Sequence, residues 1–249
     1  MNRIAQWAPL AALAGVAAIM AAYGPIPQLP HYHAFADSRT MLGVPHAMDV
    51  LSNAGFAVVG LWGLWRLREP AVHAHLGRAW AGYALFMAAL VMTAAGSSYY
   101  HLAPDDARLV WDRIPIALAC AGLLAGVYAQ THEARHAAGL TATLAVLAVA
   151  SVLWFSFTAV SGAGDLRPYL LMQGAPMVLA PAWQALARSP RRDRVAFGFA
   201  IALYAAAKAA ELLDHRIFEA LGFMSGHTLK HLLAAAASAV LAAAIARRG

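Results

Sequence analysis

Polar residues in pairs four positions apart, together with two further aspartates, interrupt the apolar runs of this chain. They are Asp49 with Asn53, Ser97 with His101, His227 with His231, and the single residues Asp112 and Asp214. Residues four apart lie on the same face of a helix, so the members of each pair can act on one centre. Ionisable groups inside a bilayer are costly unless they are paired, ligated or hydrated, which makes each one a candidate functional residue.

The histidines are suited to binding a metal ion. Two imidazoles four residues apart can bind one Zn²⁺, and a third from another helix leaves one tetrahedral position for water. His101, His227 and His231 are the candidate ligands. Zinc lowers the pKa of its water to about 7, which provides a nucleophile at neutral pH. The pattern predicts a metal-dependent hydrolase whose substrate arrives from the lipid.

Two other residue types could complete such a site. A carboxylate, Asp112 or Asp49, could accept or deliver a proton, and the Ser97 hydroxyl could hydrogen-bond the developing oxyanion or the metal-bound water. Each residue has a simpler explanation when taken alone. Ser97 could be a hydrogen-bond donor between helices, and Asp112 could pair with Arg113. The prediction of a metal site therefore depends on these residues occurring together.

Several other conspicuous residues are assigned to structure. Lys208 and Glu211, three apart, are interpreted as an ion pair, and Gly122 with Gly126 as glycines that let two helices pack closely. The eight remaining histidines are assigned to loops or helix ends at the surface.

The elements that must position these residues are membrane-spanning helices. Of the 249 residues, 61% are hydrophobic and only 12% are charged, and the mean hydropathy is +0.59, whereas a soluble domain carries about 25% charged residues. This composition excludes a soluble enzyme and a disordered chain. The net charge of +6 could indicate nucleic-acid binding, but the basic residues are scattered between apolar runs. The single cysteine, Cys120, excludes an internal disulfide.

The apolar runs predict eight helices. About 20 apolar residues are needed to cross a hydrocarbon core of about 30 Å. The qualifying stretches are residues 4–23, 46–65, 79–100, 109–129, 137–160, 166–186, 195–213 and 227–246. We expect an all-α membrane protein with a single domain over residues 1–249. Residues 46–246 form a seven-helix transmembrane bundle, and residues 1–24 form an extra N-terminal transmembrane helix or signal anchor.

Loop arginines indicate the orientation, because cytoplasmic loops retain positive charge. With the N-terminus in the cytoplasm, the cytoplasmic set is Arg3, Arg66, Arg68, Arg78, Arg135, Arg188, Arg191, Arg192, Arg194, Arg247 and Arg248. The outer set is Arg39, Arg108, Arg113, Arg167 and Arg216. This orientation brings all the polar residues described above to the outer face. We expect an integral protein of a bacterial inner membrane, with both termini cytoplasmic and the site on the periplasmic side.

The order of these motifs resembles the alkaline ceramidase family. That family belongs to a seven-helix membrane hydrolase superfamily that includes the progestin and adiponectin receptors. The matching strings are Leu51-Ser52-Asn53, Gly96-Ser97-Ser98-Tyr99-Tyr100-His101, Asp112-Arg113-Ile114-Pro115, Leu213-Asp214 and His227-Thr228-Leu229-Lys230-His231. They extend from the second predicted helix to the eighth, over about four-fifths of the chain.

The resemblance implies a function and a role for each site residue. Zinc would be held by His101, His227 and His231, and Ser97 and Asp112 would be the catalytic residues that attend its water. The reaction would cleave the amide bond of ceramide, or of a related N-acyl lipid from the bilayer, to a fatty acid and a free amine. Asn53 and Asp214, with Asp49 beside them, would support the ligands from a second layer.

The chain departs from that family at two places. The acidic N-terminal stretch that resembles a calcium site in eukaryotic members is absent, and His46 stands where those proteins carry a glutamate. Leu229 and Lys230 replace aromatic residues between the last two histidines. We therefore expect no calcium regulation and an altered pocket mouth.

Three other functions remain open from the sequence. The first is a lipid receptor or sensor on the same scaffold, in which zinc is structural. The second is a heme-binding electron carrier with two axial histidines. The third is an ion transporter that uses Asp49, Asp112 and Asp214, although these residues gather at one face and do not cross the bilayer as a pathway would.

Overall fold

The computed structural model describes residues 3–132, 134–160, 162 and 164–247. Arg248, assigned above to the cytoplasmic face, lies outside the described residues, as do both chain ends and the side chain of Arg3.

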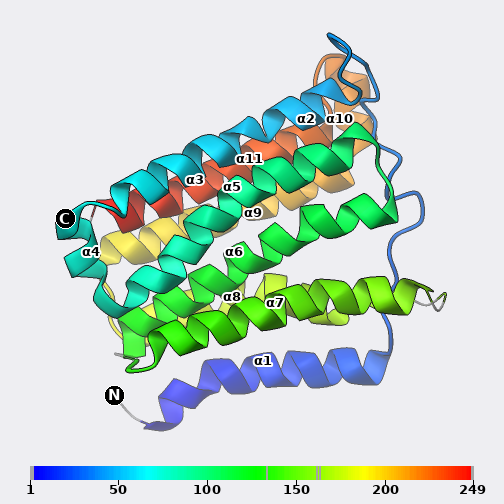
Figure 1. Ribbon diagram of the computed structural model, residues 1–249. Coiled ribbons are helices and arrows are strands. Elements are labelled where there is room, and N and C mark those ends of the chain that lie inside the picture. The colour runs from blue at the N-terminus through cyan, green and yellow to red at the C-terminus, as the bar shows by residue number, and fades with distance from the viewer. Residues whose placement is uncertain (1–2, 133, 161, 163, 248–249) are drawn as a thin grey trace.

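All the regular elements of the described residues are helices (Figure 1). The long helices are α1 (Arg3–Tyr23), α3 (Ala54–Arg66), α5 (Trp80–Leu102), α6 (Asp106–His132), α7 (Ala137–Val160), α8 (Arg167–Leu186), α9 (Arg191–Leu212) and α11 (Gly226–Ala246). The short ones are α2 (Ala47–Ser52), α4 (Pro70–Leu76), the 3-10 helix η1 (Gly77–Ala79) and α10 (Asp214–Leu221). The predicted all-α class is confirmed.

Six helical spans within the described residues are long and apolar enough to cross a membrane. One joins α2 to α3, a second joins α4 and η1 to α5, and the others are α6, α7, α9 and α11. Helix α1 contributes a shorter apolar stretch, Trp7–Tyr23. Helix α8 lies where a span was expected, but Gln173, Gln184 and its internal prolines make it less apolar. An integral membrane protein is the conclusion that these spans support.

Several helices extend past the apolar stretches that predicted them. Helix α6 was expected at residues 109–129 but begins at Asp106 and ends at His132, and α9 begins at Arg191, four residues before its expected start. The extra turns are polar, and a hydropathy criterion cannot detect them. The short helix α10 was not predicted at all because four of its eight residues are polar or charged and no apolar run covers it.

Glycines let α5 and α6 pack closely. A Cβ added at Gly82 would lie 2.4 Å from the backbone nitrogen of Gly126, and one at Gly122 would lie 2.6 Å from that of Phe86. Real Cβ atoms do not approach this closely, so any larger residue would push the helices apart. Small residues at such a seam are the usual means of helix association in membranes. The predicted packing role of Gly122 and Gly126 is confirmed.

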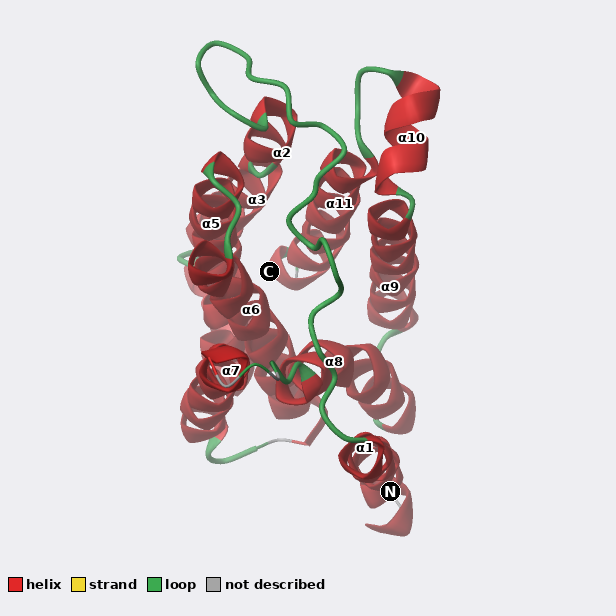
Figure 2. Ribbon diagram, turned by 90° about the vertical axis from the view of Figure 1, so that its right-hand side faces the viewer, coloured by secondary structure: helices red, strands yellow, loops and turns green. Residues whose placement is uncertain are grey.

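A long connection, residues 24–46, crosses one end of the bundle between α1 and α2 (Figure 2). We call it the strap. Near its start, the carbonyl of Ile26 accepts a 2.8 Å hydrogen bond from the backbone N–H of Leu166, just before α8. The backbone N–H of Ile26 donates to the Asp165 carboxylate at 3.4 Å. The strap is therefore fastened to the start of α8 before it reaches the other helices.

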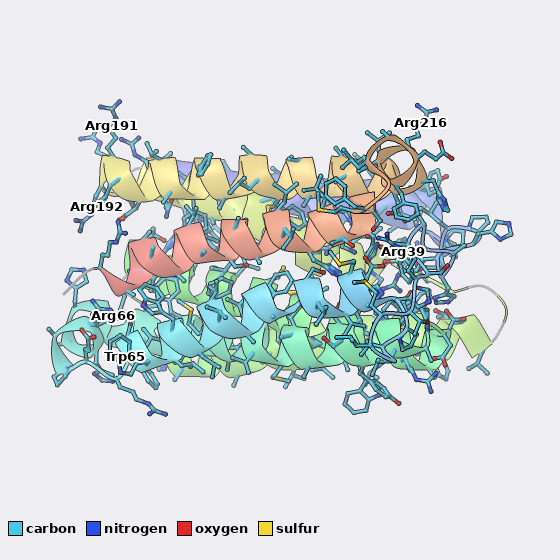
Figure 3. The ribbon with its side chains drawn as sticks, turned by 90° about the horizontal axis from the view of Figure 1, so that it is seen from above. Arg39, Trp65, Arg66, Arg191, Arg192 and Arg216 are labelled. Atoms are coloured by element: carbon cyan, nitrogen blue, oxygen red, sulfur yellow. The ribbon has the colours of Figure 1, made fainter. Side chains whose placement is uncertain are left out.

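Arginines lie at both ends of the bundle. Arg66, Arg191 and Arg192 lie at the end where α1 begins and α11 ends, whereas Arg39 and Arg216 lie at the strap end (Figures 1 and 3). All the expected site residues belong to the strap end, near the last turns of α5 and α9 and the first turns of α2, α6 and α11.

Candidate metal centre

Three histidines from two helices meet at the strap end. His101 lies in the last turn of α5, and His227 and His231 lie in the first two turns of α11. One nitrogen of each lies within 4.8 Å of those of the other two, and all three side chains are buried. The i,i+4 pair and the third histidine, whose meeting in space the sequence could not establish, form one cluster that could hold a metal ion.

The cluster fits zinc in its donor set and in an unpaired buried atom. The Nδ1 atom of His101 is buried and has no hydrogen-bond partner among the described residues. A buried polar atom without a partner is costly, and a metal ligand bond would satisfy it. Two nitrogens bound to one tetrahedral zinc lie about 3.4 Å apart. The 4.8 Å that contains the cluster is wider than this, so the histidine nitrogens have to move closer together when zinc binds.

The ring of His231 is oriented by groups at the start of the second span. Its Nδ1 lies 2.8 Å from Ser52 Oγ and 3.2 Å from the backbone carbonyl of Asp49. The Ser52 hydroxyl donates to that same carbonyl at 3.0 Å, so Nδ1 carries the proton and donates to both. This leaves Nε2 as the nitrogen that is free to bind a metal. Asp49, expected to act through its carboxylate, thus contacts His231 through its carbonyl.

The start of α11 is held by two aspartates. Asp214 accepts the backbone N–H of His227 at 2.7 Å and that of Ala36, in the strap, at 2.9 Å. The Asp49 carboxylate accepts a 2.6 Å hydrogen bond from the Thr228 hydroxyl. The bond to the backbone N–H of His227 satisfies a group that has no partner within its own helix. These aspartates position the histidine pair by fixing the helix that carries it.

Ser97 and Asp112 lie together because their helices approach closely beside them. A Cβ on Gly96 would lie 2.0 Å from the carbonyl oxygen of Trp111, the residue before Asp112. The Ser97 hydroxyl and the Asp112 carboxylate are both buried and lie beside one another. Both residues line the same cavity as His227 and His231.

The start of α11 lies equally close to another helix, α9. A Cβ on Gly226 would lie 2.2 Å from the carbonyl oxygen of Ala210 in α9. Glycine at this position lets the end of α9 come close enough for Asp214 to reach the backbone of His227. Gly96 and Gly226, each directly before one of the polar pairs, thus set the distance between helices, a role that was not expected from the sequence.

Asn53 is farther from the cluster than expected. It stands at the break between α2 and α3, where its side-chain amide donates to the Asp49 carbonyl at 2.9 Å. That carbonyl is the one that His231 contacts, so Asn53 acts on the cluster through one intermediate group.

Lys230 contacts the cluster directly. Its ammonium lies 3.3 Å from Nε2 of His227 and 2.7 Å from the Glu211 carboxylate, which also pairs with Lys208. The expected Lys208–Glu211 pair is therefore present as part of a triad. Lys230 was expected at the pocket mouth. Its side chain is only 18% exposed and lies beside the candidate ligand His227.

The strap covers the histidines. The ring centroid of Phe35 lies 4.4 Å from that of His227 and 4.7 Å from that of His101. His33, assigned to the surface from the sequence, instead contacts the Tyr100 hydroxyl at 2.8 Å and Asp106 at 3.1 Å. No motif marks these two residues, because their role follows from the path of a loop.

An ion pair fixes the strap farther along. The Arg39 guanidinium donates to the Asp37 carboxylate at 2.7 and 2.8 Å and to the carbonyl of Phe223 at 2.8 Å. Arg39 therefore ties the strap to the connection between α10 and α11. The same guanidinium holds the pKa of Asp37 below its usual value.

A cavity of about 860 Å³ extends from the cluster into the bundle. Ser97, Asp112, His227 and His231 line its polar end, and its walls are mostly apolar residues of α5, α6, α8, α9 and α11. Along α5 these are Thr93, Leu90 and Phe86, at the three- and four-residue spacing of one helical face. The lining of α11 reaches Leu241, 14 residues after His227, which is about 21 Å at 1.5 Å per residue.

No protein-family model matches the chain, and no curated protein matches it.

Proposed function

We propose that this chain is a zinc-dependent membrane hydrolase that cleaves the amide bond of ceramide or a related N-acyl lipid, as the alkaline ceramidases do. The observation that carries the proposal is the joint placement of three buried histidines and a Ser97–Asp112 pair at the polar end of an apolar cavity. A metal cluster alone would suit a structural site. The added acid, hydroxyl and lipid-sized cavity favour a reaction.

In this proposal zinc would supply the nucleophile, and protein side chains transfer the proton and stabilise the oxyanion. Zinc held by the three histidines would act as a Lewis acid and supply a nucleophilic water at neutral pH. Asp112 takes a proton from the attacking water and delivers it to the leaving amine, since it is the buried carboxylate that lines the cavity beside Ser97. Ser97 donates its hydrogen bond to the oxyanion that develops on the amide carbonyl.

The cavity is long enough to hold an acyl chain. Its lining along α11 covers about 21 Å, whereas one leaflet contributes about 15 Å, half of the hydrocarbon core. A single lipid tail therefore fits along the apolar walls while the amide stays at the polar end. Apolar walls with a few convergent polar groups are typical of small-molecule sites.

The proposal includes an orientation. The chain crosses the membrane eight times, with α1 and α8 joining the six apolar spans, and lies in a bacterial inner membrane with both termini cytoplasmic. The support is the arginine-rich end of the bundle, which carries Arg66, Arg191 and Arg192 (Figure 3). The metal centre is then on the periplasmic side.

The decisive experiment combines metal content with product release. Detergent-purified protein should contain about one zinc per chain and release fatty acid from ceramide or from an N-acyl lipid extract. His227→Ala should lose both properties, whereas His75→Ala, at the opposite end of the bundle, should keep both. Stoichiometric zinc without any release would favour the receptor, and a folded preparation without metal would refute the metal centre.

A further inference from the structure

Arg113 is a buried cation that forms no salt bridge within the described residues. It is 4% exposed and lines the cavity of the metal centre one residue after Asp112. The direct ion pair between these neighbours, one alternative from the sequence, is therefore not formed, although the charge of Arg113 still acts on the Asp112 carboxylate. A buried charge is costly unless it is paired and hydrogen-bonded.

Aromatic rings hold the guanidinium in place. Its central carbon lies 4.8 to 5.3 Å from the ring centroids of Tyr32, Phe155 and Tyr169. Such contacts stabilise a cation through the face of the ring but use none of its N–H groups. One terminal nitrogen, Nη1, is buried and has no hydrogen-bond partner among the described residues.

Gln28, in the strap, presents a second unused donor at the same place. Its carbonyl Oε1 accepts a hydrogen bond from Arg113 Nη2, which identifies the other side-chain atom as the amide nitrogen. That nitrogen, Nε2, is also buried and unpartnered, and Gln28 lines the same cavity. The guanidinium of Arg113 and the side-chain amide of Gln28 are thus adjacent planar groups that carry one positive charge. Each has one nitrogen, Nη1 and Nε2, whose N–H groups have no acceptor among the described residues.

We propose that Arg113 and Gln28 bind the carboxylate of the substrate's headgroup, so that the preferred lipid is an N-acyl amino acid. The two unpaired donors match the two oxygens of a carboxylate, and charge-assisted bonds of this kind are the strong ones. The identity of the cleaved bond rests on the proposed function, whereas the binding of the carboxylate does not.

The position of Arg113 fits this substrate. Consecutive Cα atoms are about 3.8 Å apart, and neighbours on a helix point about 100° apart. Asp112 and Arg113 therefore flank adjoining parts of one cavity. In an N-acyl amino acid the carboxylate is one carbon from the amide nitrogen, so the amide would lie by Asp112 while the carboxylate reaches Arg113. A neutral headgroup such as that of ceramide would leave both donors unpaired, and sites of this type discriminate strongly against it.

Binding measured before appreciable hydrolysis tests the site without depending on turnover. Purified full-length protein is titrated with N-palmitoylglycine, with N-palmitoylethanolamine, which shares the acyl chain but ends in a hydroxyl, and with palmitate. N-palmitoylglycine should bind tightest, and Arg113→Gln should weaken it at least about tenfold while leaving the ethanolamide within about twofold. Gln28→Leu, in the strap, should give a smaller loss of the same selectivity. Arg108→Gln, which removes another arginine from α6 outside the cavity, should change neither affinity.

The outcomes separate this inference from the proposed function. Equal affinity for the glycine and ethanolamine lipids, or no effect of Arg113→Gln and Gln28→Leu, would overturn it even if both lipids are hydrolysed. Palmitate that binds as tightly as N-palmitoylglycine, with the same loss in Arg113→Gln, would assign the site to a fatty-acid carboxylate and also overturn it. Selective binding without hydrolysis would support the anion site and count against the amidase.

Discussion

The cavity has two polar regions, and they are built in different ways. The histidine cluster is oriented by hydrogen bonds from buried neighbours, such as Ser52 and the Asp49 carbonyl on His231. Arg113 is oriented by aromatic faces and keeps a donor free. Hydrogen bonds fix which ring nitrogen is available, as a metal ligand requires. Contacts with ring faces fix only the position of the guanidinium, so its N–H groups stay available to a ligand.

The largest effect should follow from removing a ligand. His231→Ala should abolish zinc binding and turnover, with a loss well above the 10–100-fold typical of outer-shell changes. Metal analysis and product release measure the two effects. A His231→Ala variant that kept its zinc would show that the histidine cluster is not the metal site.

Loss of the carboxylate should separate chemistry from binding. Asp112→Asn should retain zinc but lower the turnover rate by about 10²–10⁴-fold, because the amide cannot accept the proton. Metal content and the rate at saturating lipid are the measurements. An unchanged rate would refute the proton-transfer role.

The hydrogen bond on His231 should have a moderate effect. Ser52→Ala should weaken zinc binding about 10–100-fold, since the ring loses one of the two groups that orient it. A zinc-chelator competition titration measures the affinity. Ser156→Ala is the control, because the hydroxyl of Ser156 donates within its own helix, to the carbonyl of Val152 in α7. Equal losses in both variants would point to a general packing defect.

Removing the neighbouring cation should have the opposite sign. Lys230→Met should raise zinc affinity by up to about tenfold, because it deletes a positive charge 3.3 Å from a ring nitrogen of His227. Lys208→Met, which removes the other lysine on Glu211, should have a smaller effect. The same competition titration decides, and weaker binding in Lys230→Met would show that the lysine supports the ligand.

The smallest effect concerns the strap that covers both regions. Arg39 lowers the pKa of Asp37 in the folded protein, so the pair stabilises the fold above the unfolded pKa of about 3.9 and this stability is lost as pH falls through the folded value. Arg39→Gln should lower the thermal unfolding temperature at pH 7. The difference from the unmodified chain should shrink below about pH 4. A difference that stays constant with pH would assign the effect to the Phe223 contact instead.

The sequence predicted the helices better than their connections. Apolar runs mark the part of each helix that is apolar enough to cross a membrane, but the polar turn that starts α9 and the whole of α10 lie outside any apolar run. The i,i+4 spacing predicted which histidines share a face. It could not predict Phe35 or Gln28, because their contacts depend on where the strap crosses the bundle. Nor could spacing show that Asp49 would meet His231 through a backbone carbonyl.

The attachment of the strap at Ile26 bears on proteolytic processing. Arg167 donates from the start of α8 to carbonyls at the end of α1, whereas Ile26 is bonded separately to Leu166 and Asp165. Cleavage after Gly24 would release α1 but leave those bonds to Ile26 intact. Phe35 would stay over the histidines, so a matured chain that lacks its first helix would keep the same metal centre.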